Sequence, residues 1–172
     1  IGEAKFLRAL FYFDLVRAWG GVPLATSTTP QTLPRSTMEQ VYDFIDKDLL
    51  DAITVLPEKS DYTTSSDLGR ASKGAAKALL SKVYLFQNDY VNAAAYAGEV
   101  INSAQYSLEP DFDNANSQTG EHGIESVFEV GAYRNEGIDN GGNQYANVQG
   151  VRGAPNRGWG FNRPTLDLRN AF

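Results

Sequence analysis

One stretch constrains the fold most: residues 6–24, FLRALFYFDLVRAWGGVPL, whose apolar side chains point in almost every direction around a helix. A helix on the surface of a domain carries its apolar residues on one side only. Here Glu3, Asp14 and Arg17 share one side, and most of the rest of the circumference is apolar or aromatic. We therefore predict a helix from the chain start to about Ala18 that lies in the middle of a bundle and is contacted on several sides.

Three further helical patterns follow, each with a start signal. Residues 41–56 carry an apolar residue at nearly every fourth position, and Ser36 with Glu39 has the spacing of a capping box before them. Ser72 and Asp89 have side chains that cap helices, and each precedes another helical pattern. The residues that we expect to be buried on these two later helices are Leu79, Leu80, Val83, Tyr84, Ala93, Ala94, Ala97, Val100 and Ile101.

The junction of these two later helices resembles the tetratricopeptide pattern. Counting from Tyr84, an aspartate follows at +5, an aromatic residue at +6, and alanines at +9 and +13. Small residues at such positions let two antiparallel helices pack closely. The first two helices would form a second, more degenerate pair. The predicted fold class is therefore mainly α, with tetratricopeptide-like helix pairs over about residues 1–104.

Beyond Ala104 the sequence changes to turn-forming residues. Residues 124–130, IESVFEV, alternate between apolar and polar and predict a short strand. The Gly- and Asn-rich segment 131–158 has no helical period and predicts a long irregular loop, which is typical of a functional or disordered segment. A final short helix is expected from Pro164 to Phe172.

Charge and composition exclude several classes of function. The formal net charge of −6 argues against a nucleic acid partner, whose phosphates require clustered Lys and Arg. The chain has no cysteine and a single histidine, which excludes disulfides, thiolate metal sites and two-histidine metal sites. Because Ile1 is not a start methionine and both ends lie within helical patterns, we expect a fragment of a longer protein.

Five stretches occur in a recognisable order and spacing: EAKFLRALFYFDLVRAWGGVPL, LPRSTMEQVYDFIDKDLLDAITVLP, GRASKGAAKALLSKVYLFQNDYVNAAAYAGEVI, ESVFEV and GWGFNRPTLDLRNAF. In this order and spacing the chain resembles the SusD/RagB family. The resemblance implies a partial SusD-like domain over residues 1–172. Its helical pairs would occupy about residues 1–104, and a loop-rich, ligand-side segment about residues 105–172.

The resemblance also implies a function. Family members are surface lipoproteins of Gram-negative bacteria that bind glycans or other nutrients beside a SusC-like TonB-dependent transporter, and they are not enzymes. We therefore expect an oligosaccharide or polysaccharide ligand and a surface-exposed position at the outer membrane. The lipid anchor would lie outside this chain, and no cofactor is implied.

Other candidate chemistry has a simpler structural explanation. Glu125 and Glu129 flank the predicted strand and suggest a glycosidase acid–base pair, but the alternation puts both on its solvent face. His122, in GEHG, has no evident catalytic partner and is interpreted as a loop residue. Three oxygen-bearing residues lack the glycine and distal glutamate of a calcium loop: Asp111, Asp113 and Asn114. We predict no catalytic site and no metal site.

The ligand-facing residues are expected in the long loop. A carbohydrate site combines aromatic platforms with a few directed hydrogen-bonding groups. Tyr133, Arg134, Asn135 and Tyr145 offer both kinds of group, and we predict that they contact the glycan. The alternative function is a tetratricopeptide-like scaffold for protein–protein interaction without small-molecule binding. The aromatic loop favours the first interpretation, because scaffolds bind in the groove of their stacked helices.

Overall fold

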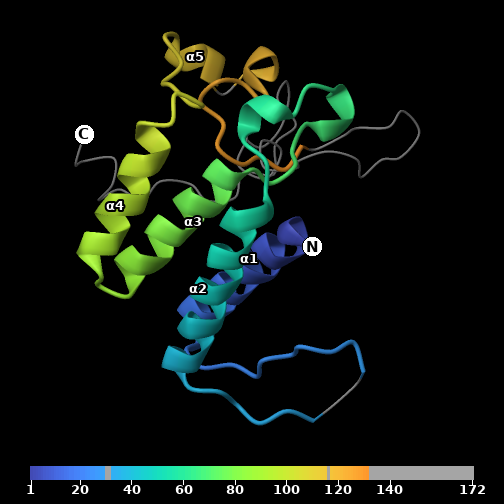
Figure 1. Ribbon diagram of the computed structural model, residues 1–172, viewed down its shortest axis with the longest axis vertical. Helices are drawn as coiled ribbons and strands as arrows, with labels where there is room; N and C mark the ends of the chain where they lie inside the picture. Colours follow the sequence, from blue (N-terminus) through green and yellow to red (C-terminus); the bar gives the residue numbers. More distant parts are fainter. Residues whose placement is uncertain (30–31, 116, 132–172) are drawn as a thin grey trace, which may run out of the picture. The chain divides into compact units, whose positions relative to one another are not determined.

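The computed structural model describes residues 1–29, 32–115 and 117–131, and Ile1–Glu129 form one compact unit (Figure 1). Within the described residues the regular structure is entirely helical, which confirms the predicted mainly α fold class. The longer helices are α1 (Gly2–Trp19), α2 (Met38–Val55), α3 (Lys73–Phe86) and α4 (Tyr90–Ile101). The short elements are α5 (Phe112–Ala115) and three 3-10 turns, η1 (Lys59–Asp61), η2 (Ser65–Asp67) and η3 (Gln118–Gly120).

The four longer helices form two pairs. α1 packs mainly on α2, and α3 packs mainly on α4. In Figure 1 the two members of each pair run in opposite directions. α2 also packs on α3 and joins the pairs, whereas α1 has few contacts with α3. This is the stacked arrangement of helix pairs that the tetratricopeptide-like spacing predicts.

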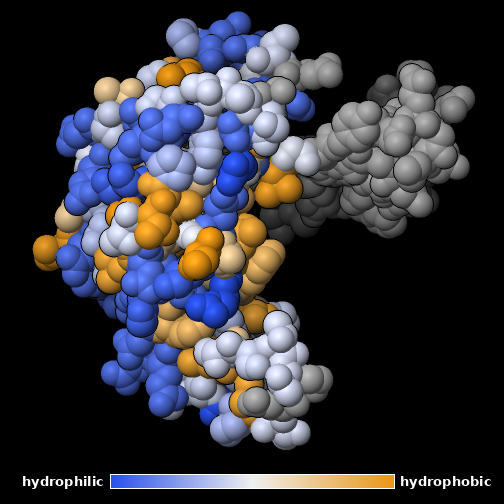
Figure 2. Space-filling view, turned by 45° about the vertical axis from the view of Figure 1, so that its right-hand side comes forward, coloured by the Kyte–Doolittle hydropathy of each residue, from blue (hydrophilic) through white to orange (hydrophobic). Residues whose placement is uncertain are grey.

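α1 has two apolar faces, and only one of them is buried within the described residues. The inner face carries Phe6, Ala9, Tyr12, Phe13 and Val16. The outer face carries Leu7, Phe11, Leu15 and Trp19, which are 39%, 61%, 37% and 64% exposed. Figure 2 shows a face of the molecule on which hydrophobic areas interrupt the hydrophilic surface. We predicted that α1 is contacted on several sides. The described residues contact it on its inner side only.

The glycine pair at the end of α1 is required by backbone geometry. Gly20 has a φ of +69°, in the left-handed region that favours glycine. A side chain at Gly21 would overlap the carbonyl oxygen of Ser36, so the two segments meet backbone to backbone. Arg35 donates hydrogen bonds to the carbonyl oxygens of Gly21 and Trp19. The chain therefore turns sharply after α1 and is held in that turn.

α2 begins one residue later than predicted. The hydroxyl of Thr37 accepts the N–H of Gln40 at 3.2 Å, and the Gln40 side chain accepts the N–H of Thr37 at 2.9 Å. The prediction of Ser36 and Glu39 as the capping box was wrong. The physical reason is that the N–H of Ser36 donates to the carbonyl of Val22 at 3.3 Å, which holds Ser36 in the connection.

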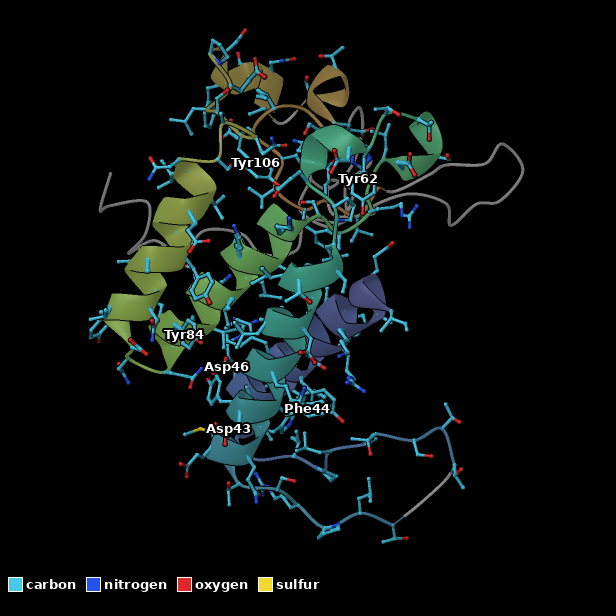
Figure 3. The ribbon with its side chains drawn as sticks, in the orientation of Figure 1. Asp43, Phe44, Asp46, Tyr62, Tyr84 and Tyr106 are labelled. Atoms are coloured by element: carbon cyan, nitrogen blue, oxygen red, sulfur yellow. The ribbon has the colours of Figure 1, made fainter. Side chains whose placement is uncertain are left out.

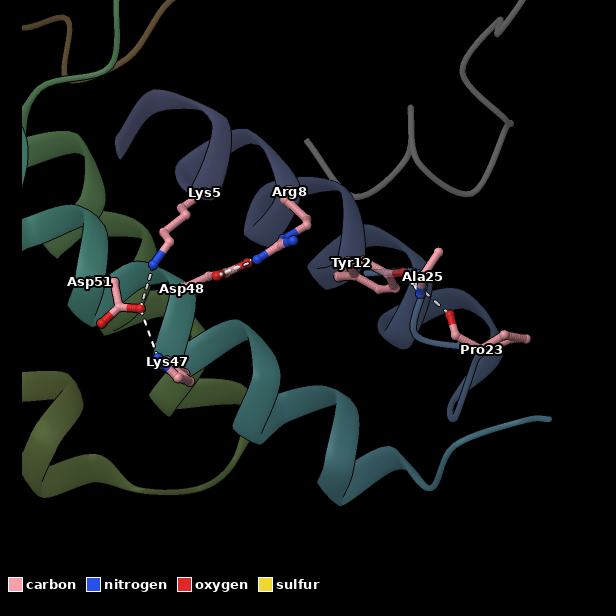
Figure 4. Close-up of polar contacts among 8 residues, drawn as sticks. All are labelled: Lys5, Arg8, Tyr12, Pro23, Ala25, Lys47, Asp48 and Asp51. Carbon is pink, nitrogen blue, oxygen red and sulfur yellow. Dashed lines mark hydrogen bonds and ion pairs between the residues drawn. The ribbon is translucent and has the colours of Figure 1, made fainter. Parts of the chain in front are cut away.

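Ion pairs fix α1 against α2 (Figure 4). Arg8 donates two hydrogen bonds to the carboxylate of Asp48, from Nε at 2.6 Å and from an Nη at 2.8 Å. Asp51 accepts from Lys5 at 2.6 Å and from Lys47 at 2.8 Å. Two of these three pairs cross from one helix to the other, so they define the register of the contact.

Tyr12 ties the start of the α1–α2 connection to α1. Its hydroxyl accepts the N–H of Ala25 at 2.7 Å and donates to the carbonyl of Pro23 at 3.3 Å (Figure 4). The hydroxyl of one buried tyrosine thus makes hydrogen bonds with two backbone groups of an irregular segment. Buried polar groups require such partners.

Both predicted caps of the second helix pair are confirmed. The hydroxyl of Ser72 accepts the N–H of Ala75 at 3.2 Å at the start of α3. The carboxylate of Asp89 accepts the N–H of Asn92 at 3.1 Å at the start of α4. Hydrogen bonds of this kind satisfy N–H groups that have no partner inside a helix.

The interface between α3 and α4 differs from the prediction on the α4 side. Leu80, Val83, Ala93 and Val100 are buried, and Leu79, Tyr84 and Ala97 are half-buried. Ala94 and Ile101 were expected to be buried and are exposed. These two residues lie seven positions, about two turns, apart on one side of α4, which faces away from α3.

The predicted strand at residues 124–130 was wrong, because this segment forms turns and bends. The N–H of Ser126 donates to the carbonyl of Gly123 at 3.2 Å, which bends the chain instead of extending it. The consecutive side chains of Val127 and Phe128 both pack against the core, so the alternation that a strand needs is broken. Phe128 meets the ring of Phe6 edge-on, with 4.8 Å between ring centroids.

Residues 132–172 lie outside the described residues. Nearly all of the predicted irregular loop at 131–158 and the whole predicted helix from Pro164 to Phe172 fall there. Both stay predictions.

Candidate functional site

A pocket of about 160 Å³ opens between two connecting segments. One is the α2–α3 connection, which contributes Lys59, Tyr62 and Arg70, and the other is the 122–129 turn. We call this the connection pocket. In Figure 3, Tyr62 and Tyr106 mark the end of the helices at which the α2–α3 connection lies. The pocket therefore lies at the ends of the helix pairs and not in the groove between them.

Lys59 holds the two segments together. It lies in η1, and its ammonium group donates to the carbonyl oxygens of Gly123 at 2.6 Å and Ser126 at 2.7 Å. The same group lies 5.0 Å from the centroid of the Tyr106 ring, within cation–π distance. Burial lowers the pKa of Lys59 from its ordinary value. One side chain thus joins parts of the chain that are more than 60 positions apart.

Glu129 organises the 122–129 turn. One of its carboxylate oxygens, Oε2, accepts the N–H of His122 at 2.9 Å and the hydroxyl of Ser126 at 3.0 Å. The His122 N–H is the main cause that holds the pKa of Glu129 below its ordinary value. His122 itself has a φ of +55°, an uncommon conformation for a residue with a side chain. Glu129 stabilises that conformation and places the imidazole beside its own carboxylate, with Nδ1 3.9 Å from Oε2.

The α2–α3 connection supplies the opposite wall. Arg70 pairs with Glu3 of α1 and with Asp67, and its guanidinium lies 5.5 Å from the centroid of the Tyr62 ring. The Tyr62 hydroxyl donates to the carbonyl of Ala71 at 2.8 Å, which fixes the ring. These contacts position the ring of Tyr62 and the guanidinium of Arg70 at the pocket.

Gly69 allows the two walls to approach. Its φ of +80° lies in the region that favours glycine. A Cβ at this position would lie 3.3 Å from the carbonyl oxygen of Glu129 and 3.4 Å from Cε1 of His122. A side chain at this position would therefore be strained by the backbone conformation and would require its neighbours to shift by a few tenths of an ångström.

The connection pocket combines polar and apolar walls. Tyr62, Leu68, Val127 and Phe128 supply apolar surface, and Lys59, Arg70, His122 and Glu129 supply hydrogen-bonding groups. A small, polar ligand with an apolar face matches such a lining.

The two glutamates that were candidates for catalysis have different surroundings. Glu125 is exposed, as predicted, and accepts the N–H of Glu109 at 3.0 Å. Glu129 was expected on a solvent face, but it is half-buried and lines the connection pocket. The difference arises because the segment forms a turn and not a strand, so the alternation does not determine which side chains face solvent.

The candidate calcium ligands Asp111, Asp113 and Asn114 lie at the beginning of the short helix α5. Oδ1 of Asp111 accepts the N–H of Asp113 at 3.0 Å at the beginning of α5. In the residues that the structure describes, no group of three or more His, Asp or Glu side chains is placed to hold a metal ion.

The predicted ligand set, Tyr133, Arg134, Asn135 and Tyr145, lies outside the described residues, so its geometry stays a prediction. Sequence reasoning missed Lys59, Tyr62 and Arg70, because the segment EKSDYTTSSDLGR reads only as a polar loop. A signal was present in Tyr62 and in Arg70, which directly follows the single glycine of that loop.

Stacked antiparallel helix pairs define a tetratricopeptide-like helical domain. Comparison with known proteins narrows this class. Residues 1–85 match a SusD-like family described as "Starch-binding associating with outer membrane". SusD-like protein P2 of Formosa agariphila is 31% identical over 182 aligned positions, which cover 96% of this chain and 35% of that protein.

Solved structures agree with this match. A SusD homolog from Bacteroides thetaiotaomicron is 35% identical, with a TM-score of 0.71 over 78% of this chain and 28% of that one. Surface glycan-binding protein A from Bacteroides thetaiotaomicron, in complex with laminarihexaose, is 30% identical, with a TM-score of 0.65 over 76% of this chain and 27% of that one.

The chain belongs to the SusD/RagB family, as the five stretches of its sequence predict. It spans between 21% and 35% of the length of the curated relatives that it matches. Within the described residues, each helix lacks the length or the apolar character that crossing a bilayer requires.

Proposed function

We propose that the protein binds a glycan at the surface of the outer membrane and delivers it to a SusC-like TonB-dependent transporter. The observation that carries the proposal is the likeness of the helical core to surface glycan-binding protein A, the relative in complex with laminarihexaose. The description of the matching family, which associates starch binding with the outer membrane, supports the location. A lipid anchor outside this chain would hold the protein there.

The protein acts by binding and not by catalysis. Hydrolysis of a glycosidic bond uses a carboxylic acid and a carboxylate on opposite sides of the bond. Glu125 and Glu129 instead accept backbone N–H groups at 3.0 and 2.9 Å. These contacts engage both carboxylates with the protein, which supports a structural or binding role for each.

Four residues of the long loop contact the glycan in this proposal: Tyr133, Arg134, Asn135 and Tyr145. A tyrosine ring stacks on the C–H face of a sugar while its hydroxyl stays solvated. The guanidinium of Arg134 and the amide of Asn135 supply directed donors to the ring hydroxyls.

The test is calorimetric titration of the full-length protein with four hexasaccharides: laminarihexaose, xylohexaose, mannohexaose and cellohexaose. Tyr133→Ala and Tyr145→Ala are expected to weaken binding by about 1 kcal/mol each, the value of a lost aromatic contact, and to leave the melting temperature unchanged. Tyr90→Ala is the matched control, because Tyr90 is a 63% exposed tyrosine of α4.

Two results would contradict parts of this proposal. Unchanged affinity together with a lower melting temperature would make Tyr133 and Tyr145 structural residues. Failure of the native protein to bind any of the four hexaoses would count against glycan binding itself.

A further inference from the structure

The connection pocket keeps hydrogen-bonding capacity that the fold does not use. An ammonium group has three N–H donors, and Lys59 gives two of them to backbone carbonyls. Besides its contact with the Tyr106 ring, the group has no third oxygen acceptor among the described residues. Both hydrogen bonds that Glu129 accepts reach Oε2. Its Oε1 is therefore an acceptor to which no described group donates. Lys59 thus offers a hydrogen-bond donor and Glu129 an acceptor, and both residues line the connection pocket.

These polar groups are already held in place. Lys59 is fixed by two carbonyl oxygens, Glu129 by His122 and Ser126, and Arg70 by Glu3 and Asp67. A ligand that binds to fixed side chains loses little free energy to their ordering. The pocket is therefore organised before any ligand enters.

The charges of the pocket favour a neutral ligand. Arg70 is compensated by two carboxylates, and the cation of Lys59 stands with the anion of Glu129. An anion such as phosphate would meet an ionised carboxylate, since the pKa of Glu129 is held below its ordinary value. A hydroxyl group, by contrast, donates to a carboxylate and accepts from an ammonium.

The size and the apolar wall narrow the ligand further. A volume of about 160 Å³ is below the roughly 300–1,000 Å³ of pockets for drug-sized molecules, so the pocket suits one ring and not a chain. Tyr62, Leu68 and Val127 offer a surface for the C–H face of such a ring. We propose that the connection pocket binds one sugar ring of the glycan, whose hydroxyl groups pair with Oε1 of Glu129 and with Lys59. This inference rests on the proposed function.

The experiment titrates laminarihexaose into the full-length protein and into Glu129→Gln. Glutamine keeps an oxygen for the N–H of His122 and replaces Oε1 by an amide donor. Loss of a hydrogen bond to a charged acceptor is expected to weaken binding roughly tenfold or more. Glu125→Gln is the matched control, because Glu125 is an exposed glutamate four positions earlier that does not line this pocket, and its affinity is expected to equal that of the native protein.

A second variant decides the outcome if Glu129→Gln melts at a lower temperature. Leu68→Ala removes apolar wall at a side chain that is 55% exposed, so the fold is expected to tolerate it while binding weakens several-fold. Native affinity for laminarihexaose in a folded Glu129→Gln protein, or in Leu68→Ala, would overturn the sugar subsite and leave the proposed function standing. Failure of the native protein to bind any of the four hexaoses would overturn both.

Discussion

Asp48 shows how a single buried charge determines the contact of two helices. Its carboxylate belongs to a residue that is 3% exposed, and Arg8 supplies two hydrogen bonds to it in a bidentate arrangement. The guanidinium of Arg8 also lies 4.6 Å from the centroid of the Phe44 ring. A buried carboxylate without such a partner is destabilising by several kcal/mol. The pair therefore disfavours any other register of α1 on α2.

Arg8→Met is expected to lower the free energy of unfolding by about 3 kcal/mol, because it leaves Asp48 buried and unpaired. Lys47→Met is the control, since Lys47 is an exposed partner of Asp51 and such pairs contribute only about 0.2–1 kcal/mol. Urea unfolding of the 172-residue chain measures both. Losses of equal size would show that the burial of Asp48 does not matter.

Asp51 makes the stability of the chain depend on pH in the acidic range. Hydrogen bonds from Lys47 and Lys5 lower the pKa of Asp51 to about 2. The ionised form is thus favoured in the folded state, and its stabilising effect is present above the unfolded pKa of about 3.9. The effect is lost as the pH falls from about 4 toward 2.

Asp51→Asn is expected to melt at a lower temperature than the native chain at pH 6. The difference is expected to shrink between pH 4 and pH 2, where the native carboxylate takes up its proton. Melting curves across this range measure it. A difference that stays constant down to pH 2 would mean that Asp51 does not stabilise through its charge.

At the scale of the element, α1 explains why a helix can be apolar on almost every side. The inner residues form the core with α2 and α3, and the outer residues Leu7, Phe11, Leu15 and Trp19 recur every fourth position along the opposite face. Residues at this spacing lie above one another on a helix. The helix thus has two separate apolar stripes with different surroundings in the described structure.

Phe13→Ala and Phe11→Ala test this difference within one helix. Phe13 is 1% exposed and meets Phe86 edge-on at 5.3 Å, so its truncation is expected to lower the free energy of unfolding by about 3–5 kcal/mol. Phe11 is 61% exposed, and its truncation is expected to change the value by only about 0.5 kcal/mol. Chemical denaturation of the 172-residue chain measures both. Comparable losses would show that the outer stripe is also covered.

At the scale of the whole unit formed by Ile1–Glu129, side chains join segments that are distant in the sequence. Lys59 connects the α2–α3 connection to the 122–129 turn, and Phe128 brings that turn to Phe6 of α1. Tyr106 closes on the start of α3, where a Cβ at Gly74 would overlap its ring. The irregular segments are therefore packed against the helix pairs at particular points.

Local patterns were sufficient for much of the helical architecture. The caps at Ser72 and Asp89 and the buried residues Leu80 and Ala93 follow from hydrogen bonds and spacings within a few turns of helix. The family resemblance was also present in the order of short stretches. These features need no knowledge of how distant segments meet.

The errors have one physical origin in contacts between distant segments. Thr37 caps α2 in place of Ser36, because Ser36 is paired with Val22. Residues 124–130 alternate like a strand, but a strand needs a partner strand, and the segment instead turns and packs onto the core.

The sequence by itself determined where the four longer helices lie, how they pair and which family the chain belongs to, because periodicity and capping act over a few residues. Only the tertiary structure decided which stripe of α1 is buried, and it alone brought Lys59 to Glu129 and formed the connection pocket. The physical reason is that burial depends on a partner surface, and a pocket depends on side chains that meet across many intervening residues.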